Sequence, residues 1–405
     1  MVFRSRARHH WWLLSGLLLA VLVTTCVVLA IQTSKRQEVS ARQANVKLAA
    51  AVSTTPANHA VAVALDAPVT VSTRSGRLAS VSVTPESGRP LAGAFDLAST
   101  RWTATGTLAP STTYVIRARV VSRSRLAITT TSTFSTVSPT SFVTMTVWPQ
   151  SGLTVGVGQP IVLKFSEPVT DPTARAQLLT HLSLAVSLPA EVGAYWFSPT
   201  ELHLRPKSYW QTGEKVSFAA SLDGWDAGGG SWGEGSPSVT FAIGDARIST
   251  VDLASHQMTV TDNGATVATY PISAGSDQYP TMNGTHIVLD RESQVQMVSS
   301  SVGIPVNSPG GYDETVYWDV HISDSGEYVH AAPWSVGAQG NANVSHGCVN
   351  LSPANAEQFM NFSRVGDIVV VANGPRPPVA GDHGVMDWGT PWSSFAPVAV
   401  SALAA

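Results

Sequence analysis

Short runs that alternate apolar and polar residues, separated by turn-forming residues, fill the chain from Ala60 onwards. Ala60–Leu65 and Tyr114–Ala118 are examples, and this alternation buries one face of a β-strand while the other faces water. Only 13% of the residues are charged, about half the usual share, which disfavours charged helical bundles. The chain is therefore predicted to be mainly β, and its 405 residues suffice for several domains.

The first two groups of strands each have the size of an immunoglobulin-like β-sandwich. We expect one sandwich over residues 59–145, closed by a strand at 142–145, and a second over residues 146–245. The Gly-rich stretch 227–233 reads as a loop, and no Lys-Ser/Thr follows it to make a phosphate-binding loop. Both sandwiches are most simply spacers.

A third, mostly β domain with one short helix is expected over residues 246–374. Asn263-Gly264 lies between two alternating runs, which is the strongest short signal for a β-hairpin. Ser352 followed by Pro353 predicts an N-cap and the first position of a helix.

The end of the chain contains one more expected strand, over residues 367–371. The segment 375–405 carries Trp388 and Trp392 and is too aromatic for a solvated linker. We expect it to pack on the third domain.

An apolar run over residues 11–31 contains no charged residue. As a helix it would be about 31 Å long, enough to cross a hydrocarbon core of about 30 Å. Arg4, Arg6 and Arg8 precede the run, which favours a cytoplasmic N-terminus, although basic residues also follow it.

We therefore expect residues 1–32 to anchor the chain in the cytoplasmic membrane, with the rest outside, in the cell envelope. A cleaved signal peptide and a lipoprotein signal ending at Cys26 are the alternatives. Residues 33–58, rich in Ala, Ser, Thr and Gln, are expected to form a flexible tether.

Cys348 is the only cysteine outside the apolar run, so it has no disulfide partner if Cys26 lies in a membrane. His346 and Gly347 precede it directly and His330 lies upstream, a combination suited to cysteine nucleophilic catalysis. A buried, unreactive cysteine is the plain alternative. A zinc site would have to use these residues with His321, and it lacks the usual ligand spacing.

Two stretches, Glu327–Trp334 and Ser345–Leu351, resemble the catalytic region of L,D-transpeptidases with a YkuD-type domain. Ser-His-Gly-Cys followed by x-Asn-Leu matches the nucleophile motif of that family, and the resemblance extends through Pro305–Tyr312 and Trp334–Gly340. With an anchor and two sandwich domains, nearly the whole chain is similar to the mycobacterial type.

The resemblance implies an enzyme that forms 3→3 cross-links between diaminopimelate residues of peptidoglycan stem peptides, through an acyl-enzyme and with release of D-Ala. It implies acylation by carbapenems and no metal, nucleotide or other cofactor. An L,D-carboxypeptidase, with water as acceptor, and a wall-binding scaffold without activity are the alternatives. The net charge of −3, without a basic block beyond the N-terminus, makes nucleic acid an improbable partner.

The resemblance also assigns catalytic roles to individual residues. Cys348 is expected to be the nucleophile and His330 the general base. The family often has Ser after this histidine; here Ala331 keeps the backbone carbonyl that orients the imidazole. His346 is expected to shape the pocket, and backbone N–H groups around His346, Gly347 and Cys348 to stabilise the oxyanion.

A second set of residues is expected to hold the substrate or wall the pocket: Tyr312, Ser345, Asn350, Trp334, Met297 and Trp318. Tyr312 matches the flap tyrosine of the family. Asp319, Asp324 and Glu327 are expected to be solvated, since no pair of carboxylates suggests glycosidase chemistry.

Overall fold

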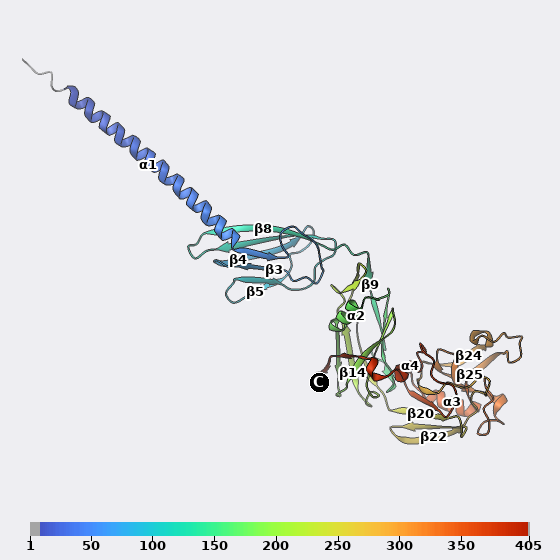
Figure 1. Ribbon diagram of the computed structural model, residues 1–405. Coiled ribbons are helices and arrows are strands. Elements are labelled where there is room, and N and C mark those ends of the chain that lie inside the picture. The colour runs from blue at the N-terminus through green and yellow to red at the C-terminus, as the bar shows by residue number, and fades with distance from the viewer. Residues whose placement is uncertain (1–8, 404–405) are drawn as a thin grey trace, which may run out of the picture. The chain divides into compact units, whose positions relative to one another are not determined.

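The computed structural model describes the backbone of residues 9–403 and the side chains of residues 22–403 (Figure 1). The chain divides into two compact units, Met1–Pro139 and Thr140–Ala405. Nearly all regular elements are strands, so the prediction of a mainly β protein is confirmed.

The N-terminal helix α1, His9–Ala50, replaces the tether predicted for residues 33–58, and β1 begins at Val52. That prediction was wrong because Ala, Gln, Lys, Arg and Glu are good helix formers, and no Gly or Pro interrupts them before Pro56. Leu48 is buried in the core of the first sandwich, which ties the end of α1 to that domain.

Part of the predicted anchor lies outside the described residues. The undescribed part comprises Arg4, Arg6 and Arg8, together with the side chains of residues 11–21. Over the part of the chain that the structure describes, no helix combines the length and hydropathy of a membrane span.

The first sandwich packs two four-stranded sheets around a core that includes Val71, Trp102 and Ile116. One sheet has the order β1 (Val52–Thr55), β3 (Thr70–Thr73), β6 (Arg101–Ala104), β5 (Gly93–Phe95). The other has the order β2 (Ala60–Val63), β8 (Ala127–Thr136), β7 (Thr113–Val121), β4 (Arg77–Pro85).

The boundary between the first and second sandwiches lies before Thr140 and not at residue 145, as predicted. The expected closing strand is split into β9, Ser141–Val143, and β10, Met145–Trp148, and both pair within the second unit. Alternating runs alone do not reveal which domain a strand joins, because partner choice is a long-range property.

The second sandwich has two five-stranded sheets and a small three-stranded sheet. The first has the order β10, β12 (Ile161–Phe165), β15 (Glu201–Pro206), β14 (Val192–Ser198), β29 (Ala396–Val398). The second has the order β11 (Thr154–Val155), β19 (Ser238–Ile243), β16 (Lys215–Ala220), β13 (Leu182–Val186), β30 (Val400–Ala402). The short helix α2, Pro172–Leu178, is capped by the Asp171 carboxylate and followed by η1, Leu179–His181.

The Gly-rich stretch predicted as a loop is instead a hairpin. It joins β17, Asp226–Gly228, to β18, Ser231–Gly233, and β18 pairs with β9. Gly229 and Gly230 both have positive φ, a conformation that glycine adopts without strain, so the turn uses the very residues that suggested a loop.

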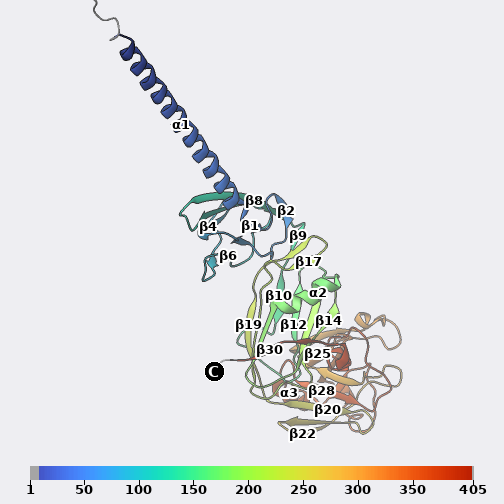
Figure 2. The same ribbon diagram turned by 60° about the vertical axis from the view of Figure 1, so that its left-hand side comes forward.

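The third domain encloses the helix α3, Pro353–Phe362, and its core between two sheets (Figures 1 and 2). One sheet has the order β22 (Ala265–Pro271), β21 (Gln257–Asp262), β20 (Arg247–Asp252), β28 (Ile368–Ala372), β23 (Gly284–Ile287). The other has the order β24 (Asp290–Val298), β25 (Asp313–Ser323), β26 (Glu327–Ala331), β27 (Val349–Leu351). The 3₁₀ turns η2 (Ser299–Val302) and η3 (Pro333–Ser335) lie in its connections.

The local signals in this domain are confirmed. Asn263 and Gly264 form the two-residue turn between β21 and β22, both with positive φ. The Ser352 hydroxyl accepts a hydrogen bond from the Asn355 N–H at 3.3 Å, and Pro353 opens α3.

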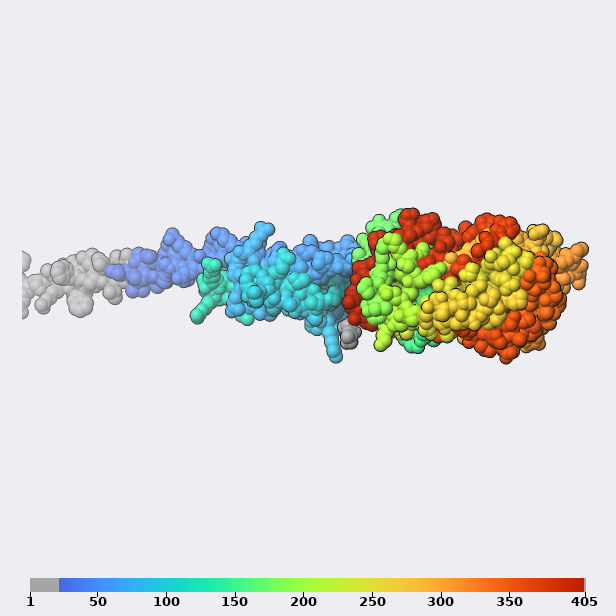
Figure 3. Space-filling model, turned by 90° about the horizontal axis from the view of Figure 1, so that it is seen from below, coloured from blue at the N-terminus to red at the C-terminus, as the bar shows by residue number. Residues whose placement is uncertain are grey.

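The C-terminal segment packs on the third domain, as predicted, only in its first part, and its last part packs on the second sandwich. After α4, Met386–Gly389, and η4, Trp392–Ser394, it adds β29 and β30 to one edge of each large sheet of the second sandwich. Figure 3 shows this segment in red against the green surface of that sandwich. The beginning of the segment instead contacts the third domain, where Arg376 pairs with Met282 and the Ser323 hydroxyl donates to the Asp382 carboxylate, so the prediction holds for that part.

Candidate functional site

A cavity of about 300 Å³ opens in the third domain beside the end of β27. Its lining combines the predicted nucleophile and histidines with residues from the β24–β25 hairpin and the loop before β25. The lining residues are Met297, Gly310, Gly311, Tyr312, Glu314, Val316, His330, Trp334, Val344, Ser345, His346, Cys348 and Asn350.

The parallel pairing of β26 with β27 brings Cys348 and His330 together. Val329 pairs with Val349 and His330 with Asn350, so Cys348 stands just before β27 on the face that His330 occupies. Side chains two residues apart on a strand share a face, and both residues line the cavity.

The His330 imidazole is held in one tautomer. Its Nδ1–H donates to the Ala331 backbone carbonyl at 3.0 Å, which leaves Nε2 with a lone pair to accept a proton. The expected orienting contact therefore exists although Ala331 has no hydroxyl. Burial lowers the pKa of His330 to about 4, so this imidazole is neutral.

Cys348 is a partly buried thiol whose Sγ contacts the Gly326 carbonyl oxygen at 3.7 Å. Burial raises the pKa of this thiol, and the nearby carboxylates of Glu327 and Asp319 raise it further. With a neutral imidazole beside it, the resting pair is thiol and imidazole rather than an ion pair.

Hydrogen bonds tie the loop before Cys348 to its surroundings. The Ser345 hydroxyl donates to the Cys348 carbonyl at 2.6 Å and accepts from the Gly347 N–H at 3.1 Å. The buried Thr281 hydroxyl donates to the Gly347 carbonyl at 2.7 Å. Gly347 has a φ of 130°, which glycine tolerates far better than other residues, so the loop shape depends on it.

Aromatic rings cover one side of the cavity. The His346 ring lies 4.7 Å from the ring centre of Tyr279 and 5.3 Å from that of Tyr312. Trp334, more than half exposed, lies 6.2 Å from the His330 ring on another side. Tyr279 was missed by sequence reasoning, because it lies outside the stretches that carry the family resemblance.

Behind the cavity, Asn350 is buried and its side-chain amide donates to the Ser335 hydroxyl at 3.1 Å. This bond joins β27 to η3, the turn that carries Trp334. Asn350 thus positions the cavity wall as well as lining it.

Comparison with known sequences identifies the family. The profile of an L,D-transpeptidase catalytic domain matches residues 246–371, and that of a bacterial Ig domain matches residues 60–226. L,D-transpeptidase 2 of Mycobacterium tuberculosis (strain CDC 1551 / Oshkosh) is 40% identical over 336 residues, covering 83% of this chain and 81% of the relative. The chain belongs to the L,D-transpeptidase family.

Other family members agree. L,D-transpeptidase 5 of Mycobacterium tuberculosis (strain ATCC 25618 / H37Rv) is 32% identical over 357 residues, covering 86% of this chain and 76% of the relative. A solved L,D-transpeptidase in complex with imipenem matches with a TM-score of 0.50 and 35% identity, over 56% of this chain and 97% of that one. The protein is thus an enzyme, an L,D-transpeptidase with immunoglobulin-like domains ahead of its catalytic domain.

One residue assigned to the transpeptidase pocket lies elsewhere. Trp318 does not line the cavity but packs against the core of the catalytic domain. It has a φ of 59° where the pairing of β25 with β26 is irregular, and that bulge shifts the alternation of side chains. The bulge moves Trp318 to the other face of the strand, and the alternation of residues in the sequence did not reveal the bulge.

Two carboxylates expected to be solvated are buried beside the transpeptidase loop. Glu327 accepts from Arg376 Nη1 at 2.6 Å and from the Met282 N–H at 3.0 Å, and burial raises its pKa to about 7. Asp319 has no hydrogen-bond partner on either carboxylate oxygen, and burial raises its pKa to about 7 as well. Both lie close enough for their charge to act on Cys348.

The zinc alternative considered from the sequence needs His321 beside Cys348, His330 and His346. His321 instead lines a different cavity, and its ring stacks on Tyr328 with 4.3 Å between centroids. These four side chains therefore do not form one site.

Proposed function

We propose that the chain is a peptidoglycan L,D-transpeptidase that forms 3→3 cross-links with Cys348 as nucleophile and His330 as general base. The observation that carries this proposal is the pairing of β26 with β27, which presents the thiol and an imidazole with a free Nε2 to one cavity. Family membership supports the reaction class.

In the first half-reaction, Sγ attacks the carbonyl carbon between diaminopimelate and D-Ala of a donor stem while the thiol proton passes to His330 Nε2. The tetrahedral intermediate collapses, the C–N bond breaks, and the D-Ala amine leaves with the proton from His330. A thioester on Cys348 and a neutral imidazole remain. In the second half-reaction, the side-chain amine of an acceptor diaminopimelate attacks the thioester and gives its proton to His330. The C–S bond of the thioester breaks as the amide cross-link forms, and His330 gives its proton to Sγ, which regenerates the thiol and the neutral imidazole.

In the free enzyme Cys348 is a thiol and His330 a neutral imidazole. The proton is therefore expected to move from Sγ to Nε2 during the attack rather than before it. Burial raises the pKa of Cys348 and lowers that of His330, so a separated ion pair is disfavoured in the free enzyme. The attack therefore requires the bound carbonyl to take up the negative charge as the proton moves to Nε2.

The oxyanion formed on attack needs hydrogen-bond donors near Cys348. The Gly347 N–H already donates to the Ser345 hydroxyl, which leaves the N–H groups of His346 and Cys348 as the candidate donors. Losing one such donor typically costs about 10²–10³ in rate. Substrate contacts are assigned to the cavity lining, chiefly Tyr312, Trp334 and Met297.

The test uses the purified full chain with a diaminopimelate-containing tetrapeptide stem, followed by mass spectrometry. Cross-linked dimers with loss of D-Ala, absent with Cys348→Ala, are expected. Tripeptide without dimer would replace this proposal with an L,D-carboxypeptidase. Unchanged substrate with a folded protein would favour the scaffold without activity.

We also propose that carbapenems acylate Cys348, because one similar L,D-transpeptidase has been solved in complex with imipenem. Intact-mass spectra after incubation with imipenem should show one adduct per chain. Cys348→Ala should show none, and Cys26→Ser, the matched control at the other free cysteine, should keep it. An adduct on Cys348→Ala would place the reaction at another residue.

We propose further that the N-terminal segment anchors the enzyme in the cytoplasmic membrane. In support, the described part of the apolar run exposes large side chains on α1: Leu22, Val23, Val27, Val28, Leu29 and Ile31. The full chain is expected in carbonate-washed membranes, and a variant lacking residues 1–32 in the supernatant. A soluble chain of shortened mass would indicate a cleaved signal peptide instead.

A further inference from the structure

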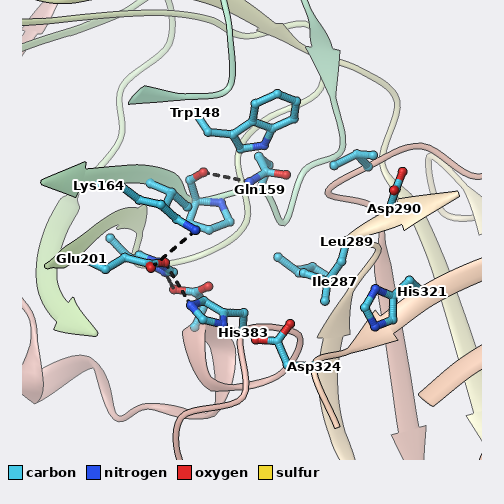
Figure 4. A pocket seen from close by; sticks show the side chains of 15 residues that line it. Trp148, Gln159, Lys164, Glu201, Ile287, Leu289, Asp290, His321, Asp324 and His383 are labelled. Atoms are coloured by element: carbon cyan, nitrogen blue, oxygen red, sulfur yellow. Dashed lines mark hydrogen bonds and ion pairs between the residues drawn. The ribbon is translucent and has the colours of Figure 1, made fainter. Parts of the chain in front are cut away.

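A second cavity, of about 560 Å³, lies between the second sandwich and the catalytic domain, which belong to one compact unit (Figure 4). The sandwich contributes Glu201 and His203 from β15, and the C-terminal segment contributes His383 and Asp387. None of its lining residues lines the cavity of Cys348, so it is a separate site.

Three potential metal ligands converge at one end of this cavity. One ligand atom each of Glu201, His203 and His383 lies within 4.8 Å of the other two. Glu201 Oε1 is 2.6 Å from His203 Nε2 and 3.0 Å from His383 Nε2. Figure 4 shows Glu201 and His383 reaching toward each other from different parts of the chain.

Each histidine has a carboxylate on its far nitrogen. His203 Nδ1 lies 2.7 Å from Asp387 Oδ1, and His383 Nδ1 contacts Asp324 Oδ2. Histidines that bind metals usually donate their other N–H to a carboxylate or carbonyl, which fixes the tautomer and raises ligand basicity. Here two such pairs direct both Nε2 atoms to the same carboxylate oxygen.

The ring positions are also set by packing. Phe197 stacks on both imidazoles, with centroid distances of 4.8 Å to His203 and 4.2 Å to His383. His383 Nε2 is buried and, although close to Glu201, has no partner in hydrogen-bond geometry. A metal ligand must point into the site with a lone pair that no hydrogen bond occupies, and His383 Nε2 does so.

We propose that Glu201, His203 and His383 bind one Zn²⁺ ion that joins the second sandwich to the C-terminal segment. Two imidazole nitrogens and a carboxylate oxygen are a ligand set that zinc accepts in tetrahedral geometry, with bonds of about 2.0–2.2 Å. Such bonds separate the ligand atoms by roughly 3.3–3.5 Å. The 2.6 Å spacing must therefore widen by roughly 0.7–0.9 Å and the 3.0 Å spacing by roughly 0.3–0.5 Å.

The fourth position faces the cavity and suits a water molecule. Binding requires both Nε2 atoms to be deprotonated, so any proton held there is released as the ion enters. Lys164 lies 3.6 Å from Glu201 Oε2, the other carboxylate oxygen, and its largely exposed side chain can swing into solvent.

The experiment measures zinc binding to the full chain by isothermal titration calorimetry. The parent carries Cys26→Ser and Cys348→Ser, so that neither thiol binds the metal. One Zn²⁺ per chain and a raised melting temperature are expected. His383→Gln should weaken binding by more than about 100-fold, and Asp324→Asn by about 10–100-fold, as the loss of a carboxylate that holds a metal-binding histidine does.

His321→Gln is the matched control, because His321 lines the same cavity outside the ligand cluster and should leave binding unchanged. Substitution of the buried His203 could unfold the sandwich, so Co²⁺ provides an independent readout on the parent. Intense visible bands of tetrahedral Co²⁺, lost in His383→Gln, support the site. Absence of stoichiometric binding to the folded parent, or unchanged binding in His383→Gln, would overturn the proposal and leave an ionic cluster only.

Discussion

At the scale of single residues, the catalytic pair depends on contacts that the backbone makes. Ala331 orients His330 through a carbonyl that any residue supplies, so the departure from Ser leaves this contact intact. Gly347, in contrast to Ala331, matters through its own residue type. The loop requires a positive φ at this position, which residues with a side chain adopt only with strain.

Asp319 is predicted to destabilise the enzyme at neutral and alkaline pH. Its folded pKa is raised from 3.8 to about 7, so the folded state retains a proton that the unfolded state has lost. The loss of unfolding free energy caused by Asp319 is therefore absent below about pH 4, grows as the pH rises and is complete above about pH 7.

Asp319→Asn should raise the unfolding free energy by about 1–3 kcal/mol at pH 8, because the neutral amide removes an unpaired buried charge, and much less at pH 4, where Asp319 is itself neutral. Denaturant melts at both pH values measure this difference. Asp277→Asn, at an exposed carboxylate of the same domain, is the control. Equal effects of Asp319→Asn at both pH values would refute the assignment.

At the scale of elements, the C-terminal strands protect two sheet edges. β29 pairs with β14 and β30 with β13, and Arg205 helps to hold the segment through its contacts with Trp388 and Phe395. Unpaired edges expose backbone N–H and C=O groups that promote association with other chains.

Val398→Asp is therefore expected to detach β29, since Val398 is buried against the second sandwich. We expect a loss of about 2–4 kcal/mol, in the range of other core substitutions, together with a tendency to aggregate. Calorimetry and size-exclusion chromatography measure both effects. Ala396→Asp, at an exposed position of the same strand, should change little. Equal effects of the two substitutions would show that burial of Val398 is not the cause.

At the scale of the whole molecule, the arrangement of the three hydrophobic cores predicts two unfolding transitions. The first sandwich has a core of its own, whereas Ile287 and Ile368 of the catalytic domain are buried within the core cluster of the second sandwich. The second sandwich and the catalytic domain should therefore unfold together.

Ile368→Ala tests this division, because it removes buried volume where the second sandwich and the catalytic domain share a core. It should cost about 2–5 kcal/mol in the transition of the second unit alone. Val71→Ala, at a fully buried position of the first sandwich, should shift only the other transition. Differential scanning calorimetry of the full chain measures both. A single transition that both variants shift equally would contradict the division.

The sequence by itself determined the features that depend on a few neighbouring residues. The Asn263-Gly264 turn and the Ser352-Pro353 helix start were predictable because φ preferences and capping bonds act within one turn. The motif around Cys348 indicated the family for a similar reason, since its residues are adjacent in the chain.

Only the tertiary structure decided which distant elements meet. It placed the C-terminal strands on the second sandwich, turned Trp318 into the core and buried Asp319 and Glu327 near the nucleophile. It also brought Glu201 and His203 to His383. The physical reason is that alternation shows a strand has a buried face but not which sheet edge covers it. That choice depends on packing summed over residues far apart in the chain.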